Sequence, residues 1–156
     1  MAANRANIGW YLDNQIGGED DRLTGRIYDK IITLTSAEIL ALNTTAKELV
    51  AAPGTGKVLE FISGVVFLDY GTTTYASYGH LIARTGTTNT QLSETLNKSH
   101  LVHRVADHYE VLRRLTSDNA RLDDNESIEL HASDGNPITG NGTIKIKVTY
   151  CIHDFN

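Results

Sequence analysis

The chain has 156 residues, of which 40% are hydrophobic and 21% are charged, and its formal net charge is −5 at pH 7. This length suits one domain that buries about two thirds of its unfolded surface. The negative charge disfavours nucleic acid as a partner. No long apolar run occurs, so we expect no membrane partner. We see no secretion signal, and the single cysteine, Cys151, cannot form a disulfide within the chain, so we expect synthesis in a reducing cytoplasm.

Residues 1–25 differ in composition from the rest, and we interpret them as an N-terminal arm that precedes a domain at residues 26–156. The arm is rich in polar residues and glycine around one apolar cluster, which holds the only tryptophan. One aromatic side chain can supply much of the free energy of an interface. The cluster therefore predicts an anchor made of Ile8, Trp10, Tyr11 and Leu12. The alternative is that Trp10 packs back on its own domain.

Beyond the arm, the pattern predicts an all-β domain of about six to eight short strands, as in a sandwich or barrel. We expect strands at residues 26–34, 47–51, 57–70 and 75–83 and, in preference to a helix, within 100–115. One or two helical turns are expected at residues 35–42, capped by Thr35 or Ser36 with Glu38 in the first turn. A second short helix is expected at residues 90–96.

Residues 57–70 form the longest apolar stretch, and hydrophobic side chains occur on both of its faces. A strand that is apolar on both faces must be covered on both. We expect a bulge at Ser63 and Gly64 that switches the faces. The residues predicted to form a subunit interface are Leu59, Phe61, Val65 and Phe67.

Residues 126–154 predict two strands joined by a glycine-rich loop, which would close the chain as a hairpin. Apolar residues at 144, 146, 148, 150 and 152 alternate with polar ones, as in a half-buried antiparallel strand. The loop at 133–142 is dense in residues that favour turns.

No catalytic constellation appears in the sequence, so we predict that the protein is not an enzyme. The Gly54-Thr55-Gly56-Lys57 run lacks the first glycine and the hydroxyl residue of a phosphate-binding loop, and it precedes a strand. His100, His103 and Asp107 would share one face of a helix and could hold zinc there, but a strand would separate them. We therefore expect no metal and no cofactor.

Four stretches of the sequence resemble a group of small virion proteins of tailed bacteriophages. They are TLTSAEILALN at residues 33–43, LVAAPGTGKV at 49–58, FLDYG at 67–71 and GNPITGNGTIKIKVTY at 135–150. The resemblance covers about residues 26–155 and consists of turn and strand signatures. It implies a capsid decoration (cement) protein with a β-sandwich of jelly-roll type. The partners it implies are the major capsid protein and two further copies of the chain in a homotrimer on the capsid surface.

A different class of function stays open, which is a receptor- or glycan-binding module of a head or tail fibre. Tyr70, Tyr75 and Tyr78, together with loops rich in Asn and Thr, could stack on sugars and bond to their hydroxyl groups. Binding of the isolated protein to glycans would favour this alternative. A high copy number in particles would favour the decoration protein.

Overall fold

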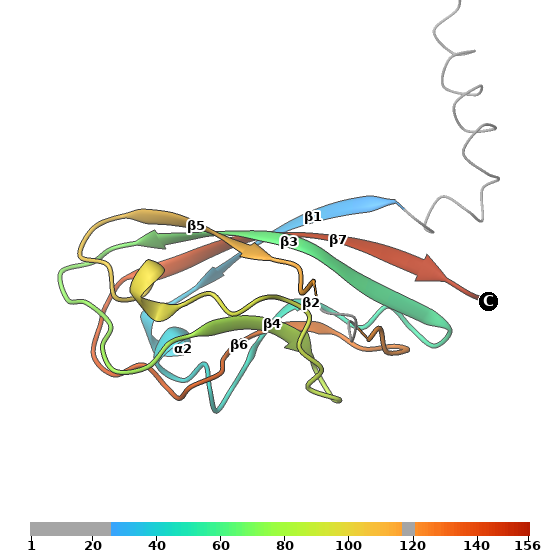
Figure 1. Ribbon diagram of the computed structural model, residues 1–156, viewed down its shortest axis with the longest axis horizontal. Helices are drawn as coiled ribbons and strands as arrows, with labels where there is room; N and C mark the ends of the chain where they lie inside the picture. Colours follow the sequence, from blue (N-terminus) through green and yellow to red (C-terminus); the bar gives the residue numbers. More distant parts are fainter. Residues whose placement is uncertain (1–25, 117–120) are drawn as a thin grey trace, which may run out of the picture.

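Two antiparallel sheets packed face to face make up the protein (Figure 1). The computed structural model describes residues 26–116 and 121–156. The four-stranded sheet has the order β1 (Ile27–Leu34), β7 (Thr143–Asp154), β3 (Lys57–Asp69), β5 (His108–Arg113). The three-stranded sheet has the order β2 (Lys47–Val50), β6 (Ile128–Ala132), β4 (Leu81–Thr85). The all-β sandwich expected from the sequence is confirmed.

The connectivity is that of a jelly roll once one irregular segment is included. Residues 91–96 run beside β4, where Gln91 bridges to Arg84 and Leu96 bridges to Leu81. Counted as a fifth strand, this segment gives the sheet orders 1-8-3-6 and 2-7-4-5 along the chain. Eight antiparallel strands in two such sheets define the double Greek key of a jelly roll.

The core lies between the sheets and is built from the apolar residues that alternate along the strands. Ile144, Ile146 and Val148 of β7 are fully buried, while Lys145 and Lys147 between them are exposed. Because successive side chains of a strand point to opposite faces, this alternation places one face of β7 on the core and the other outside. The long β3 and β7 run side by side through the centre of the four-stranded sheet (Figure 1).

The helical turn expected after the first strand is α2 (Ser36–Leu40). The Thr35 side chain accepts a hydrogen bond from the Glu38 N–H, and the Glu38 carboxylate accepts one from the Thr35 N–H at 2.8 Å. This capping box satisfies two main-chain donors that a helix otherwise leaves unpaired. The buried Ile39 side chain packs this helical turn against the core. None of the helices in the described part of the chain is long and apolar enough to cross a membrane.

Four expectations about single elements were wrong in part or whole. The last two strands do not form a hairpin, because β6 and β7 belong to different sheets. Residues 90–96 are not helical, and the short helical turn is the 3-10 helix η2 (Lys98–His100) instead. Within residues 100–115, only His108–Arg113 form a strand, β5. The strand expected at 75–83 begins later, because positive φ angles at Ser77 and Gly79 turn the chain before β4.

Candidate interaction surface

A bulge in β3 decides which of its side chains reach the surface. The register between β3 and β7 shifts between Phe61 and Ser63, so one residue is left without a partner there. Before the bulge, Leu59 and Phe61 face the core; after it, Val66 and Leu68 do. The expected switch of faces is confirmed, but the extra residue is Ile62 and not Ser63 or Gly64, which both have partners in β7. Its consequence is that one strand fills the core along its whole length and still exposes apolar residues over its second half.

Four apolar side chains meet on the face of the four-stranded sheet that is turned away from the core. We call this face the outer face and its apolar centre the outer patch, made of Val65, Phe67, Tyr109 and Val111. The register pairs Val65 with Val111 and Phe67 with Tyr109. Val65 is 45% exposed, Val111 is 46% exposed and Tyr109 is 67% exposed. The patch is contiguous because directly opposed residues of neighbouring strands touch on one face.

Contacts between aromatic rings and a lysine hold the side chains of the outer patch in place. The rings of Phe67 and Tyr109 stack with centroids 4.4 Å apart and an interplanar angle of 26°. The Lys145 ammonium lies 5.8 Å from the Phe67 ring centroid and 3.8 Å from a carboxylate oxygen of Asp69. Stacking of this kind fixes rotamers before any partner binds, which lowers the entropy lost on association.

A row of paired charges separates the outer patch from β1. Lys147 Nζ lies 2.8 Å from Asp29 Oδ2, and the Thr149 hydroxyl donates to Asp29 Oδ1 at 2.8 Å. The hydrogen bond from Lys147, followed by that from Thr149, lowers the pKa of Asp29. Beyond this row, Ile27 and Ile31 of β1 are 65% and 69% exposed. The outer face is thus apolar at both sides and polar along its middle.

The four residues predicted for a subunit interface are divided by the bulge. Leu59 and Phe61 are buried among core residues of their own chain and present no surface to a partner. Val65 and Phe67 lie on the outer face, in the patch defined above. The anchor residues Ile8, Trp10, Tyr11 and Leu12 lie outside the described residues.

The sequence interpretation missed two members of the patch, Tyr109 and Val111. They lie in the stretch 100–115, where histidines and arginines obscure the periodicity. The signal was nevertheless there: Tyr109, Val111 and Arg113 occupy alternate positions around the buried Leu112. Period-2 alternation over so short a run does not say which residues neighbour it in the sheet.

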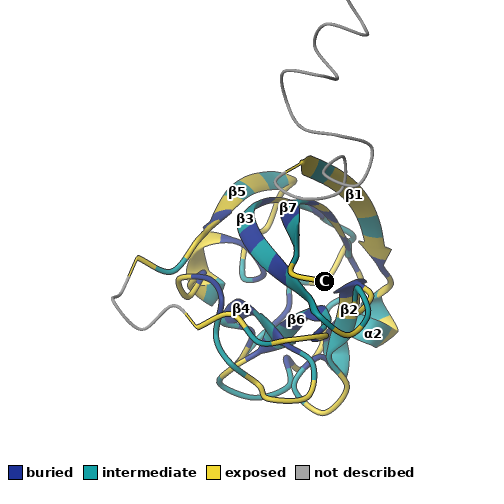
Figure 2. Cartoon of the chain, turned by 90° about the vertical axis from the view of Figure 1, so that its right-hand side faces the viewer, coloured by how far each residue is buried: buried dark blue, intermediate teal, exposed yellow. Residues whose placement is uncertain are grey.

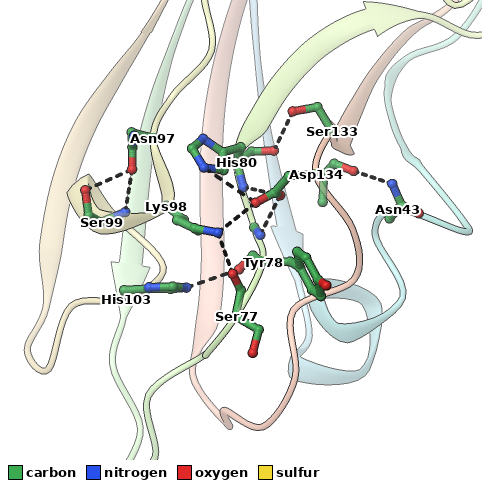
Figure 3. A network of polar contacts seen from close by, with 12 residues as sticks. Asn43, Ser77, Tyr78, His80, Asn97, Lys98, Ser99, His103, Ser133 and Asp134 are labelled. Carbon is green, nitrogen blue, oxygen red and sulfur yellow. Dashed lines mark hydrogen bonds and ion pairs between the residues drawn. The ribbon is translucent and has the colours of Figure 1, made fainter.

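At one end of the sandwich, a network of polar contacts ties three loops together (Figure 3). Asp134 Oδ1 accepts hydrogen bonds from the N–H groups of Gly79 and His80, both at 2.8 Å. Its Oδ2 lies 3.0 Å from Lys98 Nζ, which also donates to the carbonyl of Ser77. Burial alone would raise the pKa of Asp134, but the hydrogen bonds from Gly79, Lys98 and His80 outweigh it and the pKa lies below its usual range. Both carboxylate oxygens of Asp134 are engaged within the fold, which makes it a clamp between loops.

The three tyrosines considered for sugar binding do not form one site. Tyr75 is buried, donates to the Gly142 carbonyl at 2.6 Å, and has its pKa raised to about 12 by burial. Gly140, at φ 90°, lies against the Tyr75 ring so closely that a Cβ would overlap it. Tyr78 is 46% exposed, and the Lys98 ammonium lies 5.5 Å from its ring centroid. Tyr75 is therefore a core residue, Tyr70 is half-buried, and Tyr78 offers an exposed ring beside Lys98.

The histidines of residues 100–108 do not converge. His100 closes η2, and His103 Nε2 lies 3.2 Å from the Tyr78 carbonyl oxygen. His108 begins β5, and its Nε2 lies 3.8 Å from a carboxylate oxygen of Glu110. Asp107 instead accepts a hydrogen bond from the Tyr70 N–H. Among residues 26–116 and 121–156, no group of three or more His, Cys, Asp and Glu side chains is placed to hold a metal ion.

Comparison with solved structures finds similar chains in two phage capsids. The chain is similar to a chain of the cyanophage Pam1 capsid asymmetric unit, with a TM-score of 0.45 and 12% identity over 81% of this chain and 83% of that one. It is also similar to a chain of the capsid of Ralstonia phage GP4, with a TM-score of 0.42 and 14% identity over 83% of this chain and 86% of that one. No protein-family model and no curated protein matches the sequence.

Proposed function

We propose that this chain is a structural, non-enzymatic virion protein of a tailed bacteriophage, of the kind that decorates and stabilises the capsid. The observation that carries the proposal is the outer patch. Ordered apolar side chains that face solvent, as in this patch, mark a surface that works by contact with another protein. The jelly-roll connectivity and the sequence stretches that resemble small virion proteins support the same role.

The outer patch is the surface we assign to contact between copies of the chain, in a homotrimer. The apolar centre consists of Val65, Phe67, Tyr109 and Val111. Lys145 and Lys147, each paired with an aspartate, lie at its border. An apolar centre with a polar rim is the usual anatomy of a protein interface. Of the interface residues expected from the sequence, the proposal keeps Val65 and Phe67 and replaces Leu59 and Phe61 with Tyr109 and Val111.

The arm is the part we assign to contact with the major capsid protein. Ile8, Trp10 and Leu12 alternate along the sequence, so in an extended strand they share one face, while Tyr11 lies on the other. Truncating a buried tryptophan anchor costs about 2 kcal/mol or more, which is about 30-fold in affinity at each site. Three arms in one trimer multiply that effect through avidity.

Quantitative mass spectrometry of purified particles tests the assignment to the capsid. A decoration protein on the capsid surface, made in the host cytoplasm, is expected at a fixed high ratio to the major capsid protein and is removed with the shell. A ratio typical of tail components, with only a few copies in each particle, would contradict it.

The alternative of a glycan- or receptor-binding module has one observation in its favour, the exposed Tyr78 ring beside Lys98. A glycan array with the purified protein separates the two functions. Binding that Tyr78→Ala abolishes and Tyr109→Ala preserves would favour the module. If the protein binds no glycan on the array, the result favours the decoration role.

A further inference from the structure

The edge of the four-stranded sheet at β1 is open. The Phe155 N–H donates to the Gly56 carbonyl at 2.9 Å, so the odd-numbered residues of β7 direct their main-chain groups toward β3. Main-chain directions alternate along an antiparallel strand. The even-numbered residues of β7 therefore direct their N–H and C=O groups toward β1. The register pairs the even-numbered residues 144–150 with Leu34, Ile32, Lys30 and Tyr28.

It follows that Ile27, Asp29 and Ile31 direct their N–H and C=O groups away from β7, to the open side. Within the described parts of the chain, these groups have no main-chain partner there. Their side chains lie on the outer face, and Figure 2 shows β1 at the rim of the sheet, exposed over most of its length. An exposed edge strand with alternating isoleucines is a template for another strand, and proteins usually cover such an edge.

We propose that residues 8–16 of the same chain add to this edge as an antiparallel strand. The arm leads directly into Arg26, so it is tethered where the edge begins, and tethering gives a high effective concentration. Ile8, Trp10 and Leu12 supply the period-2 alternation that a strand with one apolar face needs. Main-chain hydrogen bonds to the edge would then supply affinity, as in other cases of strand addition.

The length of the arm fits a specific register. If Leu12 lies opposite Ile31, Ile16 lies opposite Ile27, and residues 17–26 remain for the connection. That connection contains three glycines, which favour turns, and at about 3.3 Å per residue it easily returns across a strand spacing of about 4.8 Å. In this register Leu12 and Ile16 pack beside Ile31 and Ile27, and Trp10 continues the outer face. The inference goes beyond the proposed function, because it gives the arm a place on its own domain before any partner binds.

Native-state hydrogen exchange, followed by NMR residue by residue, tests the pairing without any partner. We expect the amides of Ile27, Asp29 and Ile31 to exchange at least about tenfold faster after deletion of residues 2–24 than in the full chain. The amides of Tyr28 and Lys30, which face β7, serve as the internal control and should stay protected in both proteins. Equal exchange of the edge amides in the two proteins would overturn the proposal.

A pair of proline variants sharpens the test. In the proposed register the Leu12 N–H donates to Ile31, whereas the Asp13 N–H points away from β1. Since proline removes the donor, Leu12→Pro should abolish the protection of the edge amides and Asp13→Pro should keep it. If the edge amides stay protected in both variants, the proposed register is wrong. Protection that appears only as the protein concentration rises would overturn pairing within one chain and assign the strand to a second copy.

Discussion

Single polar residues hold the loop end of the sandwich together. Asp134 bonds two consecutive N–H groups in one loop and an ammonium group in another, so one carboxylate fixes the relative positions of three segments. Leaving buried main-chain donors without a partner costs about 1–3 kcal/mol. The side chain is 24% exposed, which places the expected effect toward the lower end of that range.

We expect Asp134→Ala to lower the free energy of unfolding by about 1–2 kcal/mol at pH 7, measured by urea denaturation. Because the folded-state pKa of Asp134 is lowered, its contribution is present above the unfolded-state value of about 3.9 and is lost as the pH falls through the folded-state value. The difference between wild type and variant should therefore shrink below about pH 4. A difference that stays constant between pH 7 and pH 3 would argue against the clamp.

Tyr75 and Tyr109 form a matched pair for a test of the buried hydroxyl. Tyr75→Phe removes the donor to the Gly142 carbonyl in the core and should cost about 1 kcal/mol of stability. Tyr109→Phe removes a hydroxyl from a residue that is 67% exposed and should leave stability unchanged. Thermal denaturation of both variants gives the comparison. Equal effects would show that the Tyr75 hydrogen bond contributes no net stability.

At the scale of elements, β3 is organised by its bulge. The extra residue between Phe61 and Ser63 switches which parity faces the core, so Phe61 is buried and Phe67 belongs to the outer patch. Both phenylalanines are on the same parity of the sequence, and an unbroken strand would place them on one face. The bulge thus converts a single strand into a core element followed by a surface element.

Alanine substitutions at Phe61 and Phe67 should therefore differ in their cost to the free energy of unfolding. Phe61→Ala is expected to cost about 3–5 kcal/mol because it opens a cavity in the core. Phe67→Ala should cost about 1 kcal/mol or less, since only a surface stack with Tyr109 is lost. Chemical denaturation measures both values. A similar large loss for both variants would mean that the outer patch is part of the folding core.

The sequence predicts local features of these elements better than their pairing. The capping box around Thr35 and Glu38 and the bulge near Ser63 were predictable because a few adjacent residues determine each of them. The hairpin at residues 126–154 was wrong because alternation assigns a strand one buried face and leaves its sheet undetermined. The outer patch likewise depends on the pairing of β3 with β5, which joins residues 63–68 to 108–113 through contacts far apart in the sequence.

At the scale of the whole molecule, the outer face is the surface on which the proposed assembly depends. Lysines at Val65 and Val111 place two charges at the centre of the patch, on side chains that are already half exposed. We expect Val65→Lys/Val111→Lys to leave the monomer folded by circular dichroism and to abolish the trimer in light scattering. Glu48→Lys, on exposed β2 surface, is the control and should remain trimeric. If wild type is itself a monomer at micromolar concentration, the trimer is wrong.

Co-sedimentation with phage particles that lack this chain tests the central claim most directly. The account predicts that the wild-type protein binds such particles saturably, in a fixed ratio to the major capsid protein. It predicts that Trp10→Ala, folded by circular dichroism, loses at least about 30-fold in affinity. A wild-type protein that fails to bind the depleted particles would contradict the decoration role. A variant that binds as tightly as wild type would move the anchor from the arm to the β-sandwich.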